Sequence, residues 1–130
     1  MKLQSTADDI VLSESFGFTG GFNAVGQLMK QVKSRPEVIL AASDDIALGV
    51  IKGLTSMGIK IPEDIQVIGF TDGVISRHAM PGLTTVSQHA FQMGAKAAEL
   101  LIEKIENEDF SEVHQTVIIE TELIERESTL

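Results

Sequence analysis

The hydrophobic and polar positions of this chain follow a pattern that is typical of strands and helices in alternation. Residues 38–42 form a continuous apolar run, which predicts a strand that helices cover on both faces. A helical spacing of apolar residues follows at 46–57, and a second strand is predicted at 65–70. This β-α-β order predicts a parallel α/β sheet whose crossovers are helices.

The rest of the chain extends this pattern in both directions. The further predicted elements are a strand at 10–12, a flexible turn at 16–21, a helix at 22–33, a loop at 71–82, an extended piece at 83–86, a helix at 89–106, and short strands at 117–119 and 123–124. Ser43 or Asp44 is expected to cap the helix at 46–57, and Gly58 to end it in a left-handed turn. Because a doubly wound domain normally has more strands before this point, we expect that an upstream portion is missing.

Acidic residues follow both of the central strands. Asp44 comes after the strand at 38–42, and Asp72 comes after the strand at 65–70. In an open parallel sheet, ligands bind just beyond the carboxyl ends of the strands, so this placement predicts a small-molecule site. Each residue also has a structural interpretation: Asp44 can cap its helix, and Asp72 can belong to a Thr-Asp-Gly turn.

Other candidate chemistry is sparse. Phe16 could stack on a ligand ring, although an aromatic residue beside a turn often belongs to the core. His78, His89 and His114 lack metal-ligand spacing, and no serine is framed as a nucleophile. We therefore expect no metal, no cofactor and no catalysis.

Composition and charge narrow the function further. Ten Lys and Arg residues against 19 Asp and Glu residues give a net charge of -9, so this chain is not expected to bind nucleic acid unaided. The chain has no cysteine, which excludes disulfides and thiolate metal sites. Neither a membrane-spanning run nor a signal peptide is visible, so we expect a soluble, cytoplasmic protein with no membrane partner.

Several blocks in order resemble the effector-binding domain of the lactose-repressor/galactose-repressor family of transcriptional regulators. The blocks are Ala42-Ser43-Asp44-Asp45-Ile46-Ala47-Leu48-Gly49, Ile61-Pro62-Glu63-Asp64-Ile65-Gln66-Val67-Ile68-Gly69-Phe70, Pro81-Gly82-Leu83-Thr84-Thr85-Val86, Gly94 with Ala97-Ala98 and Leu100-Leu101, and Leu123-Ile124-Glu125-Arg126-Glu127-Ser128-Thr129. The last block is similar to the family's closing arginine-x-serine-threonine. The match runs from about Phe16 to the end of the chain.

The resemblance implies a type I periplasmic-binding-protein fold, in which two Rossmann-like subdomains, joined by three crossovers, enclose a small effector. Residues 1–86 and about 120–130 would form the C-terminal subdomain, and residues 87–119 would be a helix and crossover that belong to the N-terminal subdomain. The implied function is effector sensing by a transcriptional regulator. Operator DNA would be bound only through an N-terminal domain that this chain lacks.

The resemblance also assigns roles to individual residues. Ser43 and Asp44 match the pair that contacts effector, and Phe16 matches the aromatic residue that stacks on it. Thr71 stands where many members carry a ligand-binding aspartate, so bidentate recognition of adjacent hydroxyls is lost there; Asp72 could substitute from one residue further on. The implied partners are a sugar or similar effector and a second copy of the protein, bound partly through the helix after Asp45 and the loop at 73–80.

Two other functions fit parts of the pattern. A periplasmic sugar-binding protein of an uptake system has the same fold, and an upstream signal peptide would indicate it. A phosphoacceptor switch domain would explain the acidic residues after two strands, but it requires a lysine after a further strand, and none is suitably placed. We also expect self-association through the apolar face of the helix at 89–106, because its partner subdomain is absent.

Overall fold

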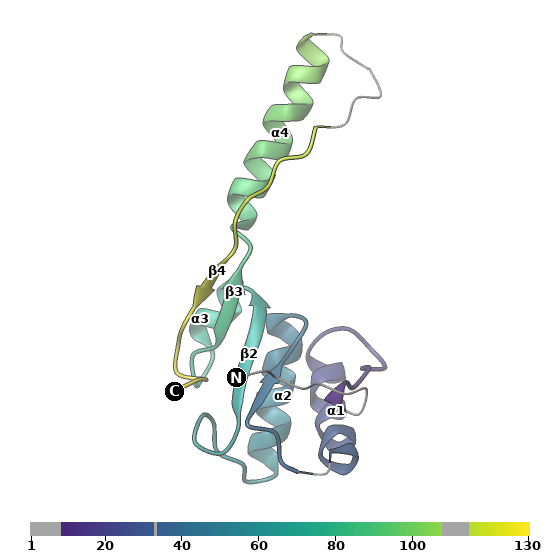
Figure 1. The fold of residues 1–130 in the computed structure, drawn as a ribbon, viewed down its shortest axis with the longest axis vertical. Coiled ribbons are helices and arrows are strands. Elements are labelled where there is room, and N and C mark those ends of the chain that lie inside the picture. Colours follow the sequence, from purple (N-terminus) through teal and green to yellow (C-terminus); the bar gives the residue numbers. More distant parts are fainter. Residues whose placement is uncertain (1–8, 33, 108–114) are drawn as a thin grey trace.

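The structure is a computed structural model that describes residues 9–32, 34–107 and 115–130. Its elements are α1 (Phe18–Gln31), β1 (Val38–Leu40), α2 (Asp44–Ser56), β2 (Gln66–Thr71), α3 (Val74–His78), β3 (Thr84–Ser87), α4 (Ala90–Glu106) and β4 (Glu122–Ile124). The strands form one sheet in the order β1-β2-β3-β4 (Figure 1). β1, β2 and β3 are parallel, and β4 runs antiparallel to β3. The α/β class predicted from the sequence is confirmed.

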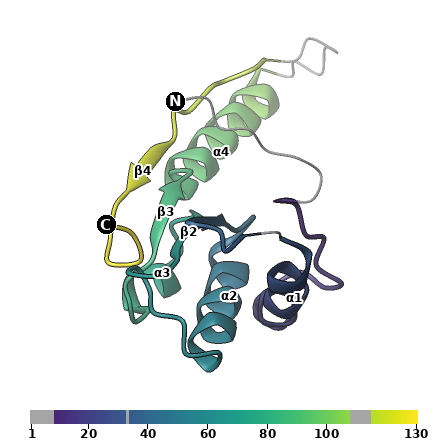
Figure 2. The ribbon, with the colours of Figure 1, turned by 60° about the horizontal axis from the view of Figure 1, so that its bottom comes forward.

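The core lies between α2 and the sheet. Val67 of β2 and Ile65, which directly precedes this strand, are fully buried, and so are Ala47 and Leu54 of α2, which packs on β2. Helix α1 packs along α2 on the same side of the sheet (Figure 2). The buried apolar residues of this cluster are Val25, Ala41, Ala47, Val50, Ile51, Leu54, Ile65, Val67 and Leu83.

Glycines allow α1 and α2 to approach closely. A Cβ atom at Gly49 of α2 would collide with the carbonyl oxygen of Phe18, and one at Gly21 of α1 would collide with the carbonyl oxygen of Ile46. Backbone atoms of one helix therefore occupy the space that a side chain of the other would need. The contact gives Gly21 a packing role inside a helix. Residues 18–21, which we predicted as part of a turn at 16–21, belong to α1, which begins at Phe18 rather than at residue 22.

Helices cover only one face of the sheet in the described part of the chain, so the prediction of two covered faces for β1 is wrong. Val38 is 45% exposed and Leu40 is 70% exposed, whereas Ile39 packs against the core. The predicted strand at 10–12 is also wrong, because these residues pair with no strand. A strand forms only where a neighbour takes up its backbone hydrogen bonds.

Two further segments differ from the predictions. The predicted loop at 71–82 contains α3, where buried Ser76 donates from Oγ to the carbonyl of Gly73 at 2.6 Å. Residues 117–119 form no strand, and the described strand near the chain end is β4. Their apolar composition suggested a strand, but a pairing partner lies beside β4 alone, on β3.

Helix α4 extends away from the rest of the molecule. Both ribbon views show it projecting from the end of β3, with the segment that leads into β4 running beside it (Figures 1 and 2). None of its described residues is buried. Its large apolar side chains Phe91, Leu101, Ile102 and Ile105 are exposed.

The close contact between α1 and α2 generates a stability prediction. Gly49→Ala should lower the free energy of unfolding by about 1–3 kcal/mol, because the added Cβ forces the two helix backbones apart. Gly26→Ala is the matched control: a Cβ there meets no atom within 4 Å, so alanine should stabilise α1 by about 0.5–1 kcal/mol. Urea unfolding of both variants measures this, and equal effects would contradict the packing argument.

Candidate functional site

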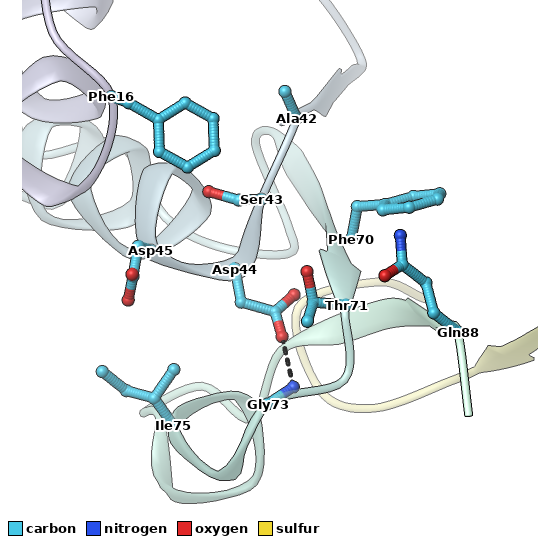
Figure 3. Close-up of a pocket in the computed structure, with 10 residues that line it drawn as sticks. All are labelled: Phe16, Ala42, Ser43, Asp44, Asp45, Phe70, Thr71, Gly73, Ile75 and Gln88. Carbon is cyan, nitrogen blue, oxygen red and sulfur yellow. Dashed lines mark hydrogen bonds between the residues drawn. The ribbon is translucent and has the colours of Figure 1, made fainter. Parts of the chain in front are cut away.

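A cleft of about 470 Å³ lies at the carboxyl ends of β1 and β2. Figure 3 shows Phe16 and Ser43 on one side of it, and Phe70, Thr71 and Gln88 on the other. The lining residues are Phe16, Ala42, Ser43, Asp44, Asp45, Phe70, Thr71, Gly73, Ile75 and Gln88. The position matches the one expected for a ligand in an open parallel sheet.

Ser43 connects the end of β1 to the start of α2. Its backbone is extended, and its Oγ accepts a hydrogen bond from the amide of Ile46 at 3.3 Å, so it is the N-cap of α2. A hydroxyl that accepts this bond still has its own proton to donate. Ser43 can therefore cap the helix and contact a ligand in the cleft at the same time.

Asp44 is buried, with 3% of its surface exposed, and both of its carboxylate oxygens have protein partners. Oδ1 accepts a 2.6 Å hydrogen bond from Thr85 Oγ1, and Oδ2 accepts one of 2.8 Å from the amide of Gly73. The carboxylate reaches β3 by passing over Gly69, where a Cβ atom would collide with Oδ1. Asp44 thus holds α2, β2 and β3 together beneath the cleft.

The turn after β2 brings Thr71 to the cleft in an unusual backbone conformation. Thr71 has a φ of 136° and Asp72 a φ of 57°, both in the region that favours glycine. For a β-branched residue such as threonine this conformation is strained. The exposed Thr71 side chain lies near Gln88 in the cleft (Figure 3), where the hydroxyl and the amide can each donate and accept hydrogen bonds.

Asp72, the remaining candidate, does not line the cleft. Its Oδ1 accepts a 2.7 Å bond from Arg126 Nη2, and its Oδ2 accepts a 3.1 Å bond from Arg77 Nη2. Burial raises the pKa of Asp72, but the hydrogen bonds and charges of Arg126 and Arg77 outweigh burial and hold the pKa below its usual value. Ser76 Oγ also donates to Oδ1 at 3.3 Å, so in this structure the carboxylate is bonded by two arginines and a serine.

The electrostatics of the cleft favour some ligands over others. Asp44 and Asp45 bring negative charge to it, and none of the lining residues that the structure describes is a lysine, arginine or histidine. Phe16, 80% exposed, and Phe70 offer aromatic rings. Such a surface suits an uncharged molecule with hydroxyl groups on its edge and an apolar face, because buried ligands pair polar edges with hydrogen-bonding groups.

The structure brings together Phe16, Ser43, Asp44 and Thr71 and leaves Asp72 apart. Sequence reasoning missed Phe70, Ile75 and Gln88 as lining residues, and it missed Thr85, which orients Asp44. Gln88 could have been found from the sequence, because it lies two residues after the extended piece predicted at 83–86. Within the described ranges, no group of three or more histidine and acidic residues could hold a metal; His114 lies outside them.

The fold and the cleft at its strand ends define a ligand-binding domain of the periplasmic-binding-protein type. The model of the periplasmic binding protein-like domain family matches residues 6–129, and the chain belongs to this family. The resemblance to lactose-repressor-type regulators is confirmed by the relatives described next. Among the described residues, no helix is long and apolar enough to span a membrane.

The chain is similar to proteins that are named as regulators. It is 31% identical to the ribose operon repressor of Haemophilus influenzae, over 91% of this chain and 35% of that protein. A LacI family transcriptional regulator of Enterococcus faecalis V583 with bound ribose is 38% identical, with a TM-score of 0.77 over 88% of this chain and 41% of that one. The regulator CelR in complex with cellobiose is 33% identical, with a TM-score of 0.77 over 87% and 34%. The chain thus spans about a third of the length of such curated relatives.

The pKa shift of Asp72 predicts how stability depends on pH. Because its folded pKa is lowered, Asp72 stabilises the fold above its unfolded pKa of about 3.9, and this contribution disappears as the pH falls through the lower folded pKa. Asp72→Asn should lower the free energy of unfolding at pH 7 by about 2 kcal/mol and make its loss between pH 5 and 2 shallower. Unfolding by denaturant across this pH range tests both.

Asp45→Asn is the control for that experiment. Asp45 is an exposed acid in the first turn of α2, and its replacement removes the same charge without touching either arginine. If both variants show the same pH profile, the two arginines do not account for the acid sensitivity.

Proposed function

We propose that this chain is the effector-sensing part of a DNA-binding transcriptional regulator, and that its cleft binds a sugar or a similar small molecule. The observation that carries the proposal is the likeness to a ribose-bound regulator, which has the same fold and is 38% identical over the aligned residues. Relatives named as repressors favour this function over the periplasmic uptake protein of the same fold. A regulator must reach DNA, so we place the protein in the cytoplasm.

The chemistry of the cleft supports an uncharged sugar. Phe16 would stack on the apolar face of the ring, while Ser43, Thr71 and Gln88 would bond its hydroxyls. Asp44 lines the same cleft and would contribute its negative field to hydroxyl donors. A phosphorylated sugar would bring negative charge close to Asp44 and Asp45, and none of the described lining residues carries a compensating positive charge, so the like charges would repel.

The domain organisation proposed here has two parts. Residues 1–86 and about 120–130 would form one subdomain, and residues 87–119 would belong to a second subdomain that encloses the effector from the other side. The exposed apolar side chains of α4 support this division, because a helix with such a face normally packs on another element. Operator binding, and the dimer formed partly through α2 and residues 73–80, would then be properties of the longer protein. Effector binding in the cleft would change the affinity of the operator-binding site.

A titration with D-ribose tests the binding proposal. We expect amide resonances of Ser43, Thr71 and Gln88 in the ¹⁵N-labelled chain to shift progressively with millimolar D-ribose, because ligand would contact these residues directly. D-Ribose 5-phosphate should cause at least about tenfold weaker changes, since its phosphate would add roughly 1.4 kcal/mol or more of repulsion. The Phe16→Ala variant should bind ribose less tightly.

Leu12→Ala, an exposed apolar residue outside the cleft, is the matched control for Phe16→Ala. Equal binding of ribose and its phosphate would contradict the charge argument. The absence of shifts with D-ribose and with cellobiose would contradict sugar binding by this chain.

The exposed apolar side chains of α4 predict self-association of the purified chain. Phe91, Leu101, Ile102 and Ile105 are all exposed, and covering them in a second copy would remove apolar surface from water. Sedimentation velocity should show a concentration-dependent dimer, and the Ile102→Glu/Ile105→Glu variant should shift it to monomer. Its thermal midpoint at low concentration should not change, because α4 has no buried residue. A wild-type chain that stays monomeric at high concentration would contradict this prediction.

A further inference from the structure

The turn that carries Thr71 into the cleft is held in place from outside the cleft. Thr71 and Asp72 both have positive φ, which persists only where surrounding contacts enforce it. On the sheet side, the amide of Gly73 donates to Asp44, and the amide of Asp72 donates to Thr85 Oγ1 at 3.4 Å. These bonds fix the backbone of the turn but leave the Asp72 side chain to other partners.

Arg126 is the principal partner of that side chain. Its Nη2 donates to Asp72 Oδ1 at 2.7 Å, and its Nη1 donates to the carbonyl of Leu83 at 2.7 Å and to Ser76 Oγ at 3.4 Å. The side chains of Arg126 and Asp72 are only 16% and 9% exposed, so solvent screens this pair less than a surface pair. Arg77 also bonds Asp72, but its side chain is 62% exposed.

The backbone of Arg126 is itself fixed to the sheet. Its amide donates to Thr84 Oγ1 at 2.8 Å, and its carbonyl accepts a 3.0 Å bond from the same hydroxyl. Arg126 lies two residues after β4, which pairs with β3 and follows the segment that runs beside α4. The guanidinium therefore joins the C-terminal segment to the turn that lines the cleft.

We propose that Arg126 is a positioning residue of the ligand site: through Asp72 it holds the Thr71–Gly73 turn in its strained conformation and so directs Thr71 into the cleft. The proposal rests on the proposed function, because it assigns the site's geometry to a residue that does not contact ligand. It makes the orientation of Thr71 depend on the segment that follows β4. A shift of the segment after β4 would then move Thr71 in the cleft, and a shift of Thr71 would move that segment.

A double-mutant cycle between the turn and Arg126 tests the proposal without any ligand. Thr71→Gly should raise the thermal midpoint of the wild-type chain, because glycine adopts positive φ without strain. In the Arg126→Gln background Asp72 loses its 2.7 Å bond to Arg126 and the turn can relax in part, so the same substitution should raise the midpoint clearly less than in the wild-type chain. An equal rise in both backgrounds would show that Arg126 stabilises the fold without straining the turn, and would overturn the proposal.

Two controls separate strain from other effects. Thr71→Ala removes the hydroxyl and the branch but keeps Cβ, so it should give a smaller rise than Thr71→Gly in the wild-type chain. Arg35→Gln removes an arginine paired with Asp64 far from the turn, and Thr71→Gly should retain its full effect in that background. Loss of the effect in the Arg35 variant would overturn the assignment to Arg126.

The amide of Gly73 provides a second readout. In Arg126→Gln its hydrogen exchange should accelerate while that of Ala47, inside α2, stays unchanged, because only the turn is released. Arg126→Lys keeps the charge but not the forked geometry, and it serves if Arg126→Gln does not fold; it should give a partial acceleration. An unchanged Gly73 rate would overturn the proposal. Failure of the ribose titration, in contrast, would bear on the proposed function alone.

Discussion

The carboxylate of Asp44 is the contact on which the cleft depends. Burying a charged group is costly unless its hydrogen bonds are satisfied, and Asp44 satisfies both oxygens by reaching the hydroxyl of Thr85 and the amide of Gly73. To do so it must cross β2 where Gly69 leaves room. The start of α2, the middle of β2, the start of β3 and the turn after β2 are therefore fixed relative to one another by one side chain.

The last residues of the chain complete this arrangement from the opposite end of the strands. Ser128 is fully buried; its Oγ donates to the carbonyl of Val67 at 2.6 Å and accepts from the amide of Thr84 at 2.8 Å. The Ser128 hydroxyl thus bridges the backbones of β2 and β3. Arg126, two residues earlier, donates from its side chain to the carbonyl of Leu83, and Thr129 Oγ1 lies 2.8 Å from Thr84 Oγ1, so all three of these polar side chains of the closing block bond to residues of β2, β3 or the segment before β3.

The sequence was sufficient to predict those features that depend on neighbouring residues. The Ser43 cap, the left-handed Gly58 and the acid after β1 follow from local rules, and the structure has the first two as expected. Long-range pairing could not be read in this way. The prediction for residues 10–12 failed because strand formation requires a partner, and Asp72 lies outside the cleft because Arg126, 54 residues away in sequence, bonds its carboxylate.

The position of β1 at the edge of the sheet affects the tendency of this protein to aggregate. In the described sheet β1 is an edge strand with a single neighbour. Its free backbone groups, together with exposed Val38 and Leu40, favour pairing with a strand of another molecule. What opposes intermolecular pairing there is long-range repulsion from a net charge of -9, not a covering element among the described residues. Acidification toward the isoelectric point near 4.6, or high salt, removes that repulsion. The solubility of the protein should therefore depend strongly on pH and salt concentration.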